Sequence, residues 1–443
     1  AGNIVQGNAC RLDWEEVCPK SKDDEIYILG NPPYLGYSRQ NNEQKEDISF
    51  VFKFVKDYKK LDYIACWFYR ANLFIADTNN QFAFVTTNSI CQGIQVALLW
   101  PLLLDEKVEI SFAHKSFEWK NNAKHNAGVY VIIVGLRKVS NKPKLLFSNN
   151  RKLLANNINP YLSNSSNIII QSRKKSLSEL PAMLSGLKAG DDGNLILNES
   201  EKNILLKEYP MADSFIKKYI GAKDFMNGHN RYCIWVSYEN SDLAYSIPAF
   251  KLRFDALKKF RLASKKEATQ RKSKTPYAFD ETNLIEADSI IIPQTGSERR
   301  LYLPVGFLSS NYVISNGARA IYNSKPWTFS MLSSKMHIVW VKGIAGRLKM
   351  DMQYSNTLCY NTFPFPSISK QRKEELTQCT LKIIDERLKH SEKTLAQLYD
   401  PDKMPEALKE AHHQNDLAVE RCYRSTPFSS DEERLEYLFK LYE

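Results

Sequence analysis

Ile26-Tyr27-Ile28-Leu29-Gly30-Asn31-Pro32-Pro33-Tyr34 joins an apolar run to an unusual turn. The first five residues predict a buried β-strand, because they form a short apolar run. The two prolines lack a backbone N–H and restrict the backbone torsions, so the strand ends at Asn31. A main-chain carbonyl can then point away from the sheet. A carboxamide, a free carbonyl and an aromatic ring therefore follow the end of one strand.

This arrangement is typical of enzymes that methylate an exocyclic amino or amide nitrogen with S-adenosylmethionine. The side-chain oxygen of Asn31 and the carbonyl of Pro32 can each accept one N–H of an adenine amino group. The nitrogen lone pair then turns toward the methyl group, and Tyr34 offers a ring on which a flipped base can stack. We predict Asn31, Pro32, Pro33 and Tyr34 as catalytic residues; the alternative is an ordinary turn after a core strand.

Residues 1–140 alternate between apolar strands and helices, which predicts the α/β class. We expect a partial doubly wound, Rossmann-like sheet, with ligands beyond the carboxyl ends of its strands. Asn31 lies at such an end. The predicted strands are 26–29, 82–86, 108–112 and 129–135, and the predicted helices are 60–76 and 94–104.

The remainder divides into a mixed α+β domain, residues 141–366, and a helical region, residues 367–443. In the helical region, Leu381, Ile384, Leu388, Leu395 and Leu398 recur at helical spacing and predict core packing. Residues 141–200 are rich in Asn, Ser and Lys and are expected to form a long connection.

Positive charge is concentrated in residues 251–275, which hold ten Lys or Arg against two acidic residues. The whole chain carries a net charge of +11, which favours a polyanionic partner. A solvated helix face is the plain alternative, but this density indicates contacts with nucleic-acid phosphates. The predicted phosphate-binding residues are Lys258, Lys259, Lys265, Lys266, Arg271 and Lys272.

Composition excludes several classes of protein. No apolar run approaches the roughly 20 residues of a membrane span. The eight cysteines include no Cys-x-x-Cys pair and the seven histidines supply no zinc spacing, so we expect no metal site and a reduced, cytoplasmic protein. The sequence begins with Ala1 and already reads as the middle of a domain, so we expect a fragment of a longer polypeptide.

Several sequence blocks follow one another along the chain: residues 3–9, 13–14, 30–37, 62–67 and 87–93, then 297–300, 332–337, 346–348, 354–357 and 363–366. In this order they resemble the MmeI-like family of single-chain restriction–modification enzymes (Types IIG and IIL). The resemblance covers nearly the whole chain and implies an amino-methyltransferase domain followed by a DNA target-recognition domain.

The chain also departs from this family. The glycine-rich loop that holds the methionine part of S-adenosylmethionine is absent, as are the acidic residue for its ribose and the N-terminal nuclease domain. The chain therefore resembles the C-terminal half of such an enzyme. The cofactor pocket should be incomplete, the fragment alone inactive, and the first strand exposed at an edge. The implied partners are double-stranded DNA and the missing N-terminal half of the same polypeptide.

The resemblance also suggests roles for further residues. Phe117 is expected to cover the second face of the flipped base, with Trp119 in reserve, and Asn8 to contact the adenine of the cofactor. Lys349, Asp351 and Gln353 share one face of a strand and can address guanine, cytosine and adenine respectively. The alternatives are core aromatic residues and a surface ion pair.

Three other functions stay open. Asn31 favours adenine, because Ser is commoner at that position in enzymes that methylate N4 of cytosine. A DNA-binding module without activity is the second alternative. The third is a methyltransferase for a protein glutamine, which would not need a large basic recognition domain.

Overall fold

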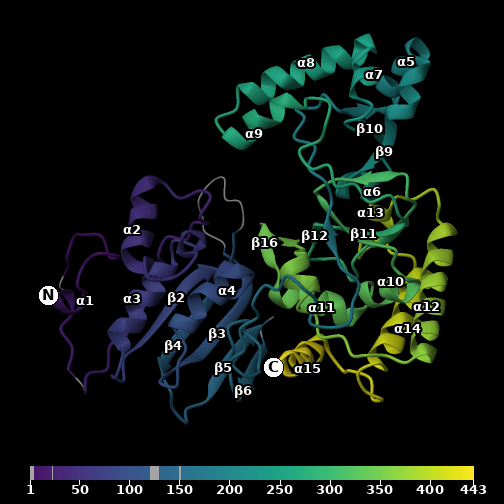
Figure 1. Cartoon of the computed structure of the whole chain (residues 1–443). Coiled ribbons are helices and arrows are strands. Elements are labelled where there is room, and N and C mark those ends of the chain that lie inside the picture. The colour runs from purple at the N-terminus through teal and green to yellow at the C-terminus, as the bar shows by residue number, and fades with distance from the viewer. Residues whose placement is uncertain (1–3, 22, 120–128, 149–150, 349) are drawn as a thin grey trace.

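A six-stranded sheet forms the N-terminal part of the molecule, in the strand order β1-β2-β4-β3-β5-β6 (Figure 1). Strands β1 and β2 are parallel, as are β3 and β5, whereas β4 is antiparallel to both of its neighbours. The carboxyl ends of β1, β2 and β3 therefore lie at the same edge. The strands are β1 (Tyr27–Gly30), β2 (Gln81–Thr87), β3 (Val108–Trp119), β4 (Val129–Lys138), β5 (Lys144–Ser148) and β6 (Arg151–Ala155).

The computed structural model describes residues 4–21, 23–119, 129–148, 151–348 and 350–443. Its mixed α/β architecture, with several sheets and a helical C-terminal region, confirms the predicted fold class. No helix within these ranges is long and apolar enough to cross a membrane.

The helices of the N-terminal part are α1 (Trp14–Val17), α2 (Asn42–Phe52), α3 (Ala65–Ile75) and α4 (Ile94–Leu99). Helix α2 begins where Asn41 and Gln44 exchange side-chain and backbone hydrogen bonds in a capping box. Helix α3 buries Phe68 edge-on against Phe82 and Phe84 of β2, with ring centroids 5.8 and 5.4 Å apart. This packing fixes the strand beside which the predicted catalytic turn lies.

Strand β1 is an edge strand, and among the described residues it pairs only with β2. The side chains of Tyr27 and Leu29 are 58% and 75% exposed. The predicted strand and its exposed edge are confirmed, but the expectation of a fully buried strand is wrong. The reason is that nothing in the described part of the chain covers the face of the sheet from which Tyr27 and Leu29 project.

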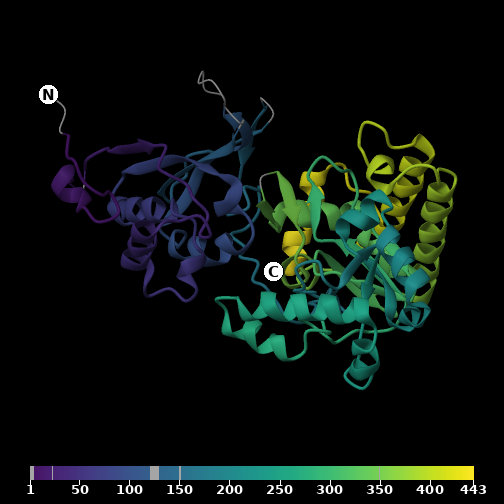
Figure 2. The ribbon, with the colours of Figure 1, turned by 90° about the horizontal axis from the view of Figure 1, so that it is seen from above.

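Three smaller sheets follow. The sheet β14-β9-β10-β8, together with α5 and α7–α9, forms the upper lobe, at the top of Figure 1. The sheets β13-β11-β15-β7 and β12-β17-β16, together with α10 and α11, belong to the central body. The strands of these three sheets are β7 (Leu184–Ser185), β8 (Ile196–Asn198), β9 (Ile216–Ile220), β10 (Arg231–Ile234), β11 (Ser289–Pro293), β12 (Thr295–Ser297), β13 (Gly306–Leu308), β14 (Tyr312–Ile314), β15 (Ala318–Tyr322), β16 (Gly346–Leu348) and β17 (Asp351–Gln353). The helices are α5 (Glu199–Glu208), α6 (Ala222–Asn227), α7 (Ser241–Tyr245), α8 (Pro248–Leu262), α9 (Glu267–Arg271), α10 (Pro326–Leu332) and α11 (Lys335–Ile344). Helices α8 and α9 form an arm that projects from the upper lobe (Figures 1 and 2).

The N-terminal sheet and the central body share one continuous hydrophobic core, whereas the upper lobe has a core of its own. The connection after β6 is packed rather than free: Tyr161 stacks on Phe439 with ring centroids 5.2 Å apart. The backbone N–H of Arg173 donates to the carbonyl of Thr357 over 2.8 Å.

The C-terminal helices are α12 (Lys370–Leu388), α13 (Leu395–Leu398), α14 (Glu406–Glu420) and α15 (Asp431–Tyr442). The predicted core stripe is confirmed for Ile384 and Leu395, which pack against the core, and for Leu398, which is buried. It is wrong for Leu381 and Leu388 of α12, which are 48% and 66% exposed. Arg387 faces inward instead, because its guanidinium donates to the hydroxyl of Tyr399 and to the carbonyl of Val305.

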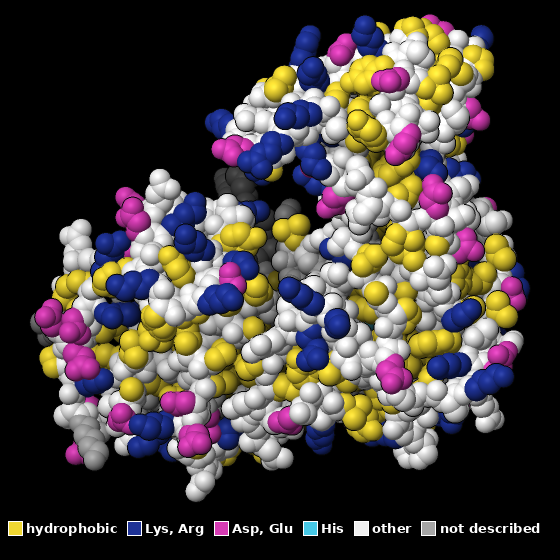
Figure 3. All heavy atoms as spheres, in the orientation of Figure 1, with side chains coloured by type: hydrophobic (Ala, Val, Ile, Leu, Met, Phe, Trp, Pro, Cys, Tyr) yellow, Lys and Arg dark blue, Asp and Glu magenta, His cyan; other side chains and the backbone are white. Residues whose placement is uncertain are grey.

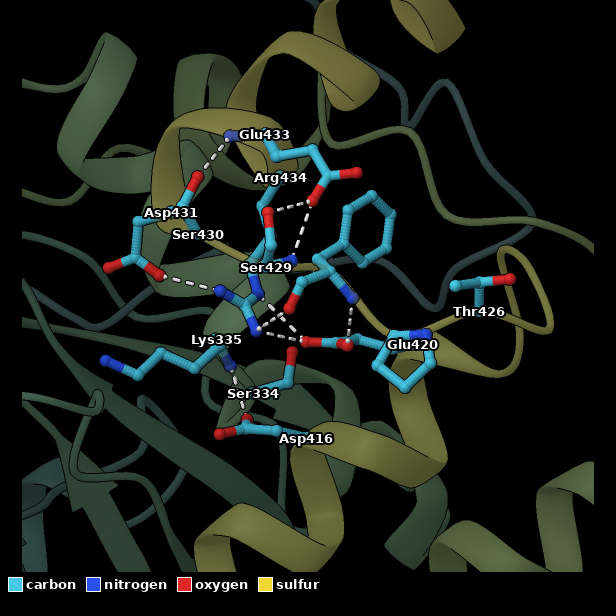
Figure 4. A network of polar contacts seen from close by, with 12 residues as sticks. Ser334, Lys335, Asp416, Glu420, Thr426, Ser429, Ser430, Asp431, Glu433 and Arg434 are labelled. Carbon is cyan, nitrogen blue, oxygen red and sulfur yellow. Dashed lines mark hydrogen bonds and ion pairs between the residues drawn. The ribbon is translucent and has the colours of Figure 1, made fainter.

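A buried polar network joins α11, α14 and α15 (Figure 4). The guanidinium of Arg434 donates through Nε and Nη2 to Glu420, over 2.8 and 2.6 Å. Asp416 accepts the backbone N–H of Lys335, at the start of α11, and the hydroxyl of Tyr302, each over 2.7 Å. Burial raises the pKa of Asp416 to about 7.

Candidate active site and DNA interface

The predicted catalytic turn occupies the carboxyl edge of the N-terminal sheet. Gly30, the last residue of β1, pairs with Phe84 of β2, and Asn31 follows directly. Asn31 is exposed, Pro32 is buried, and the Tyr34 ring is half-buried against the core. The Asn31 carboxamide makes no hydrogen bond to any residue that the structure describes, so its oxygen is available to a ligand.

Asp62 fixes the chain just after this turn. Its carboxylate is buried and accepts the backbone N–H of Leu35 over 2.8 Å and the hydroxyl of Ser89 over 3.2 Å. Burial raises the pKa of Asp62, and the hydrogen bonds to the carboxylate act against that shift.

Phe117 lies at the same edge of the sheet as Asn31. The segment 116–119 belongs to β3, beyond an irregularity between His114 and Phe117, so this strand is longer than the predicted 108–112. Phe117 pairs with Val131, which pairs with Thr87 of β2, so the three residues form one row across the sheet. β1 and β3 are separated by three strand spacings, roughly 14 Å in total. Phe117 and Trp119 are both half-buried, with ring centroids 6.2 Å apart.

Asn8, predicted to contact the cofactor, takes part in a local network. Its side-chain nitrogen donates to Asp47 over 2.9 Å, and its side-chain oxygen accepts the backbone N–H of Cys10. The same carboxylate of Asp47 accepts the hydroxyl of Tyr63 and Nε of Arg11, each over 2.7 Å. Asn8 therefore orders the segment before β1.

The predicted base-reading residues lie on β17, the middle strand of the β12-β17-β16 sheet. Met352 is buried, whereas Asp351 is exposed and Gln353 is half-buried on the opposite face. Gln353 exchanges hydrogen bonds with Thr295 of β12 over 3.3–3.5 Å. Lys349 lies outside the described residues.

A close backbone contact joins this small sheet to the N-terminal sheet. Gly93, in the loop after β2, donates its N–H to the carbonyl of Ile344 over 2.9 Å. Gly93 has a φ of 60° and a ψ of −148°, and a Cβ atom there would lie 3.0 Å from the Cα of Gly346. Gly346 pairs in turn with Gln353. The loop after β2 and the strand β17 are thus held at a fixed separation.

Most of the predicted phosphate-binding residues lie on the α8–α9 arm. Figure 3 shows Lys and Arg side chains along this arm, above a notch that separates it from the N-terminal part. Lys258, Lys259, Lys265, Lys266 and Arg271 are exposed. 

Two cations of the same basic segment point inward. Lys272 is half-buried, and its ammonium group donates to the carbonyl of Asp280 over 2.6 Å, so the structure argues against a phosphate contact there. Arg261 is fully buried and donates to the carbonyls of Thr275 and Ala278. Both residues hold the arm together.

Three family models match successive parts of the chain. They are described as "MmeI, DNA-methyltransferase domain" for residues 1–148, "MmeI, target recognition domain" for residues 164–367, and "MmeI, C-terminal domain" for residues 368–443. The chain belongs to the MmeI family. The resemblance inferred from the sequence blocks is confirmed.

Two longer relatives illustrate what this chain is similar to. "DNA methyltransferase A" of Bacillus subtilis (strain 168) is 43% identical over 444 residues, which are 100% of this chain and 50% of that protein. The structure of the Type IIL restriction–modification enzyme MmeI in complex with DNA matches with a TM-score of 0.89 at 34% identity. That match covers 99% of this chain and 59% of the other. The chain thus spans about half the length of these relatives.

Sequence reasoning missed three features of this MmeI-family site. Asp62 and Gly93 lie inside sequence blocks that carry the resemblance. A single sequence gives no sign that Asp62 contacts the chain just after the Asn31–Tyr34 turn, or that Gly93 contacts the β12-β17-β16 sheet. A second basic stretch is also exposed on the connection between α2 and α3, comprising Lys53, Lys56, Lys59 and Lys60.

Proposed function

We propose that this chain is the base-handling and DNA-reading part of a site-specific DNA methyltransferase that methylates N6 of adenine. The observation that carries the proposal is the Asn31 carboxamide. It is exposed and unbonded within the described structure, and it lies where ligands of such sheets bind. The match to the MmeI methyltransferase and target-recognition domains supports the same proposal.

The residues of the turn act on the target base. The oxygen of Asn31 and the carbonyl of Pro32 accept the two N–H bonds of the amino group, which directs its lone pair outward. Tyr34 stacks on one face of the flipped base and Phe117 covers the other. S-adenosylmethionine, when bound, supplies the methyl group on its sulfonium. The protein lowers the barrier by alignment and by hydrogen bonds that favour the developing charge.

The residues of this chain do not fit a complete cofactor pocket. The amide of Asn8 already bonds to Asp47 and to the backbone of Cys10, and the family's glycine-rich loop is absent from the sequence. We therefore expect the chain alone to be inactive. The upstream half of the polypeptide would supply the pocket, pair with the free edge of β1 and cover the face of the sheet from which Tyr27 and Leu29 project.

DNA is held by two surfaces in this proposal. Asp351, Gln353 and Lys349 read base edges, while the exposed cations of the α8–α9 arm contact phosphates and leave sequence discrimination to β17. Since both surfaces lie within this chain, a DNA-binding module without activity is the second candidate for the fragment on its own. N4 of cytosine is the second candidate target for the whole enzyme.

Expression of the full-length polypeptide in a methylation-free host, followed by single-molecule sequencing, tests the proposal. N6-methyladenine in one short motif is the expected result. N4-methylcytosine would overturn the target base, and an unmodified genome would overturn the activity. Asn31→Ala should abolish methylation and leave DNA binding nearly unchanged. The matched control is Asn79→Ala, an exposed asparagine at the opposite edge of the sheet.

A further inference from the structure

The catalytic turn is held at both of its ends. At the first end, Gly30 belongs to the β1–β2 ladder. At the second end, Leu35 donates its N–H to Asp62, and its carbonyl accepts the N–H of Tyr63 over 3.1 Å and the side-chain amide of Gln40 over 3.0 Å. The two prolines between these points have no N–H to donate. The position of Asn31 therefore depends on these two anchors.

Asp62 also connects the turn with the neighbouring strand ends. Its second carboxylate oxygen accepts the hydroxyl of Ser89, in the loop that follows β2. The adjacent residue Asn88 donates its side-chain amide to Ser116 of β3 over 2.9 Å, one residue before Phe117. The buried carboxylate of Asp62 thus links the turn that carries Asn31 to the loop 88–89, and this loop in turn contacts β3 beside Phe117.

We propose that Asp62 is a positioning residue, which sets the orientation of the Asn31–Tyr34 turn toward the target amino group. The inference rests on the proposed methyltransferase function. Asp62 touches neither the base nor the methyl donor; it acts through Leu35 and Ser89. Losing the carboxylate removes one of the three hydrogen bonds that form the second anchor and the link to Ser89, so the alignment of the carboxamide and of the Pro32 carbonyl is loosened.

The expected effect falls on the chemical step rather than on binding. A misplacement of about 1 Å at a reacting centre can lower a rate by roughly 100-fold. In the full-length enzyme, Asp62→Ala should therefore lower kcat by about 10- to 100-fold. The KM values for DNA and S-adenosylmethionine should stay within roughly threefold, since neither binding surface uses Asp62. Asp62→Asn should restore most of kcat, because its carboxamide oxygen can still accept the N–H of Leu35.

A matched control separates positioning from general stability. Asp416 is likewise a buried carboxylate that accepts a backbone N–H and a hydroxyl, but it lies in the C-terminal helices. Asp62 differs in accepting a second backbone N–H, that of Ile64, over 3.3 Å. Asp416→Ala should lower the melting temperature and leave kcat at 25 °C within about twofold, since it touches no part of the site. If Asp62→Ala does not fold, Ser89→Ala, which removes only one partner of the carboxylate, should still lower kcat by a few-fold.

The outcomes are distinct. Loss of kcat in Asp62→Ala, with rescue by Asp62→Asn and none of that loss in Asp416→Ala, supports the positioning role. Equal losses in Asp62→Ala and Asp416→Ala, or an unchanged kcat in both Asp62→Ala and Ser89→Ala, would overturn it. An Asn variant as impaired as the Ala variant would also overturn it. A wild-type enzyme that methylates no DNA would refute the proposed function instead.

Discussion

Replacing Gly93 by alanine tests the contact between the loop after β2 and the β12-β17-β16 sheet. The backbone of Gly93, with φ 60° and ψ −148°, lies near a region that is essentially restricted to glycine, where a side chain costs on the order of 1–3 kcal/mol. The new Cβ would also lie 3.0 Å from the Cα and 3.3 Å from the N of Gly346, so backbone would have to move. Overpacking of this kind adds roughly 1–3 kcal/mol.

The sum predicts that Gly93→Ala destabilises the protein by about 2–4 kcal/mol after partial relaxation. At roughly 2 °C per kcal/mol for a unit of this size, the melting temperature should fall by about 4–8 °C. Thermal unfolding of the full-length protein measures the shift. Gly193→Ala is the matched control, because Gly193 also has a positive φ, 79°, but nothing lies within 4 Å of its Cβ position.

Gly346→Ala should be mild, since its Cβ would meet the Cα of Gly93 at an ordinary 3.8 Å. If Gly93→Ala melts within 1 °C of the wild type, or no lower than Gly193→Ala, the close approach does not constrain the joint and the reasoning is refuted.

Three further predictions concern stability and DNA recognition. The folded-state pKa of Asp416, about 7, exceeds its usual value of 3.8, so the folded state binds the proton more tightly and this stabilisation is lost as pH rises between these values. Asp416→Asn should therefore reduce the fall in melting temperature as pH rises from 3.8 to about 7. If the melting temperature of the variant falls with pH as steeply as that of the wild type, the raised pKa is contradicted. Gln353→Ala should cost about 1–3 kcal/mol at one base pair and little at the others, which binding to single-substituted duplexes would reveal; uniform weakening would exclude base reading. Lys258→Ala combined with Lys259→Ala should reduce the slope of log K against log salt by about 1.8, whereas Lys272→Ala should leave that slope unchanged because its ammonium is bonded to Asp280. Equal slopes in the double variant and the wild type would remove the arm from the interface.

The sequence was sufficient to predict the local features of the site. Strand β1 and the turn at Asn31 were found because an apolar run and two adjacent prolines act through their own backbone. The inward Met352 between outward Asp351 and Gln353 follows from the twofold period of a strand. These features need no knowledge of distant residues.

Features that depend on tertiary partners were not predictable. Tyr27 and Leu29 are apolar yet exposed, because no described residue covers the face of the sheet from which they project. Leu388 was expected in the core of α12, but the inward position belongs to Arg387, whose hydrogen bonds to Tyr399 and Val305 offset its burial. The role of Asp62 depends on Leu35 and Ser89, each 27 residues away in sequence.

If the proposed function holds, the continuous core between the N-terminal sheet and the central body has a consequence for the bound DNA. The sheet edge that carries Asn31 and the strand β17 belong to parts that share one packed core, and Tyr161 stacks on Phe439 at their connection. Large rigid-body movement of the two parts around a straight duplex would break this packing. The adaptation must then come mainly from the nucleic acid. Unstacking of the target nucleotide and local bending would cost a few kcal/mol and would depend on flanking steps that no side chain touches. Methylation rates should therefore vary with flanking sequence even where the recognised bases are identical.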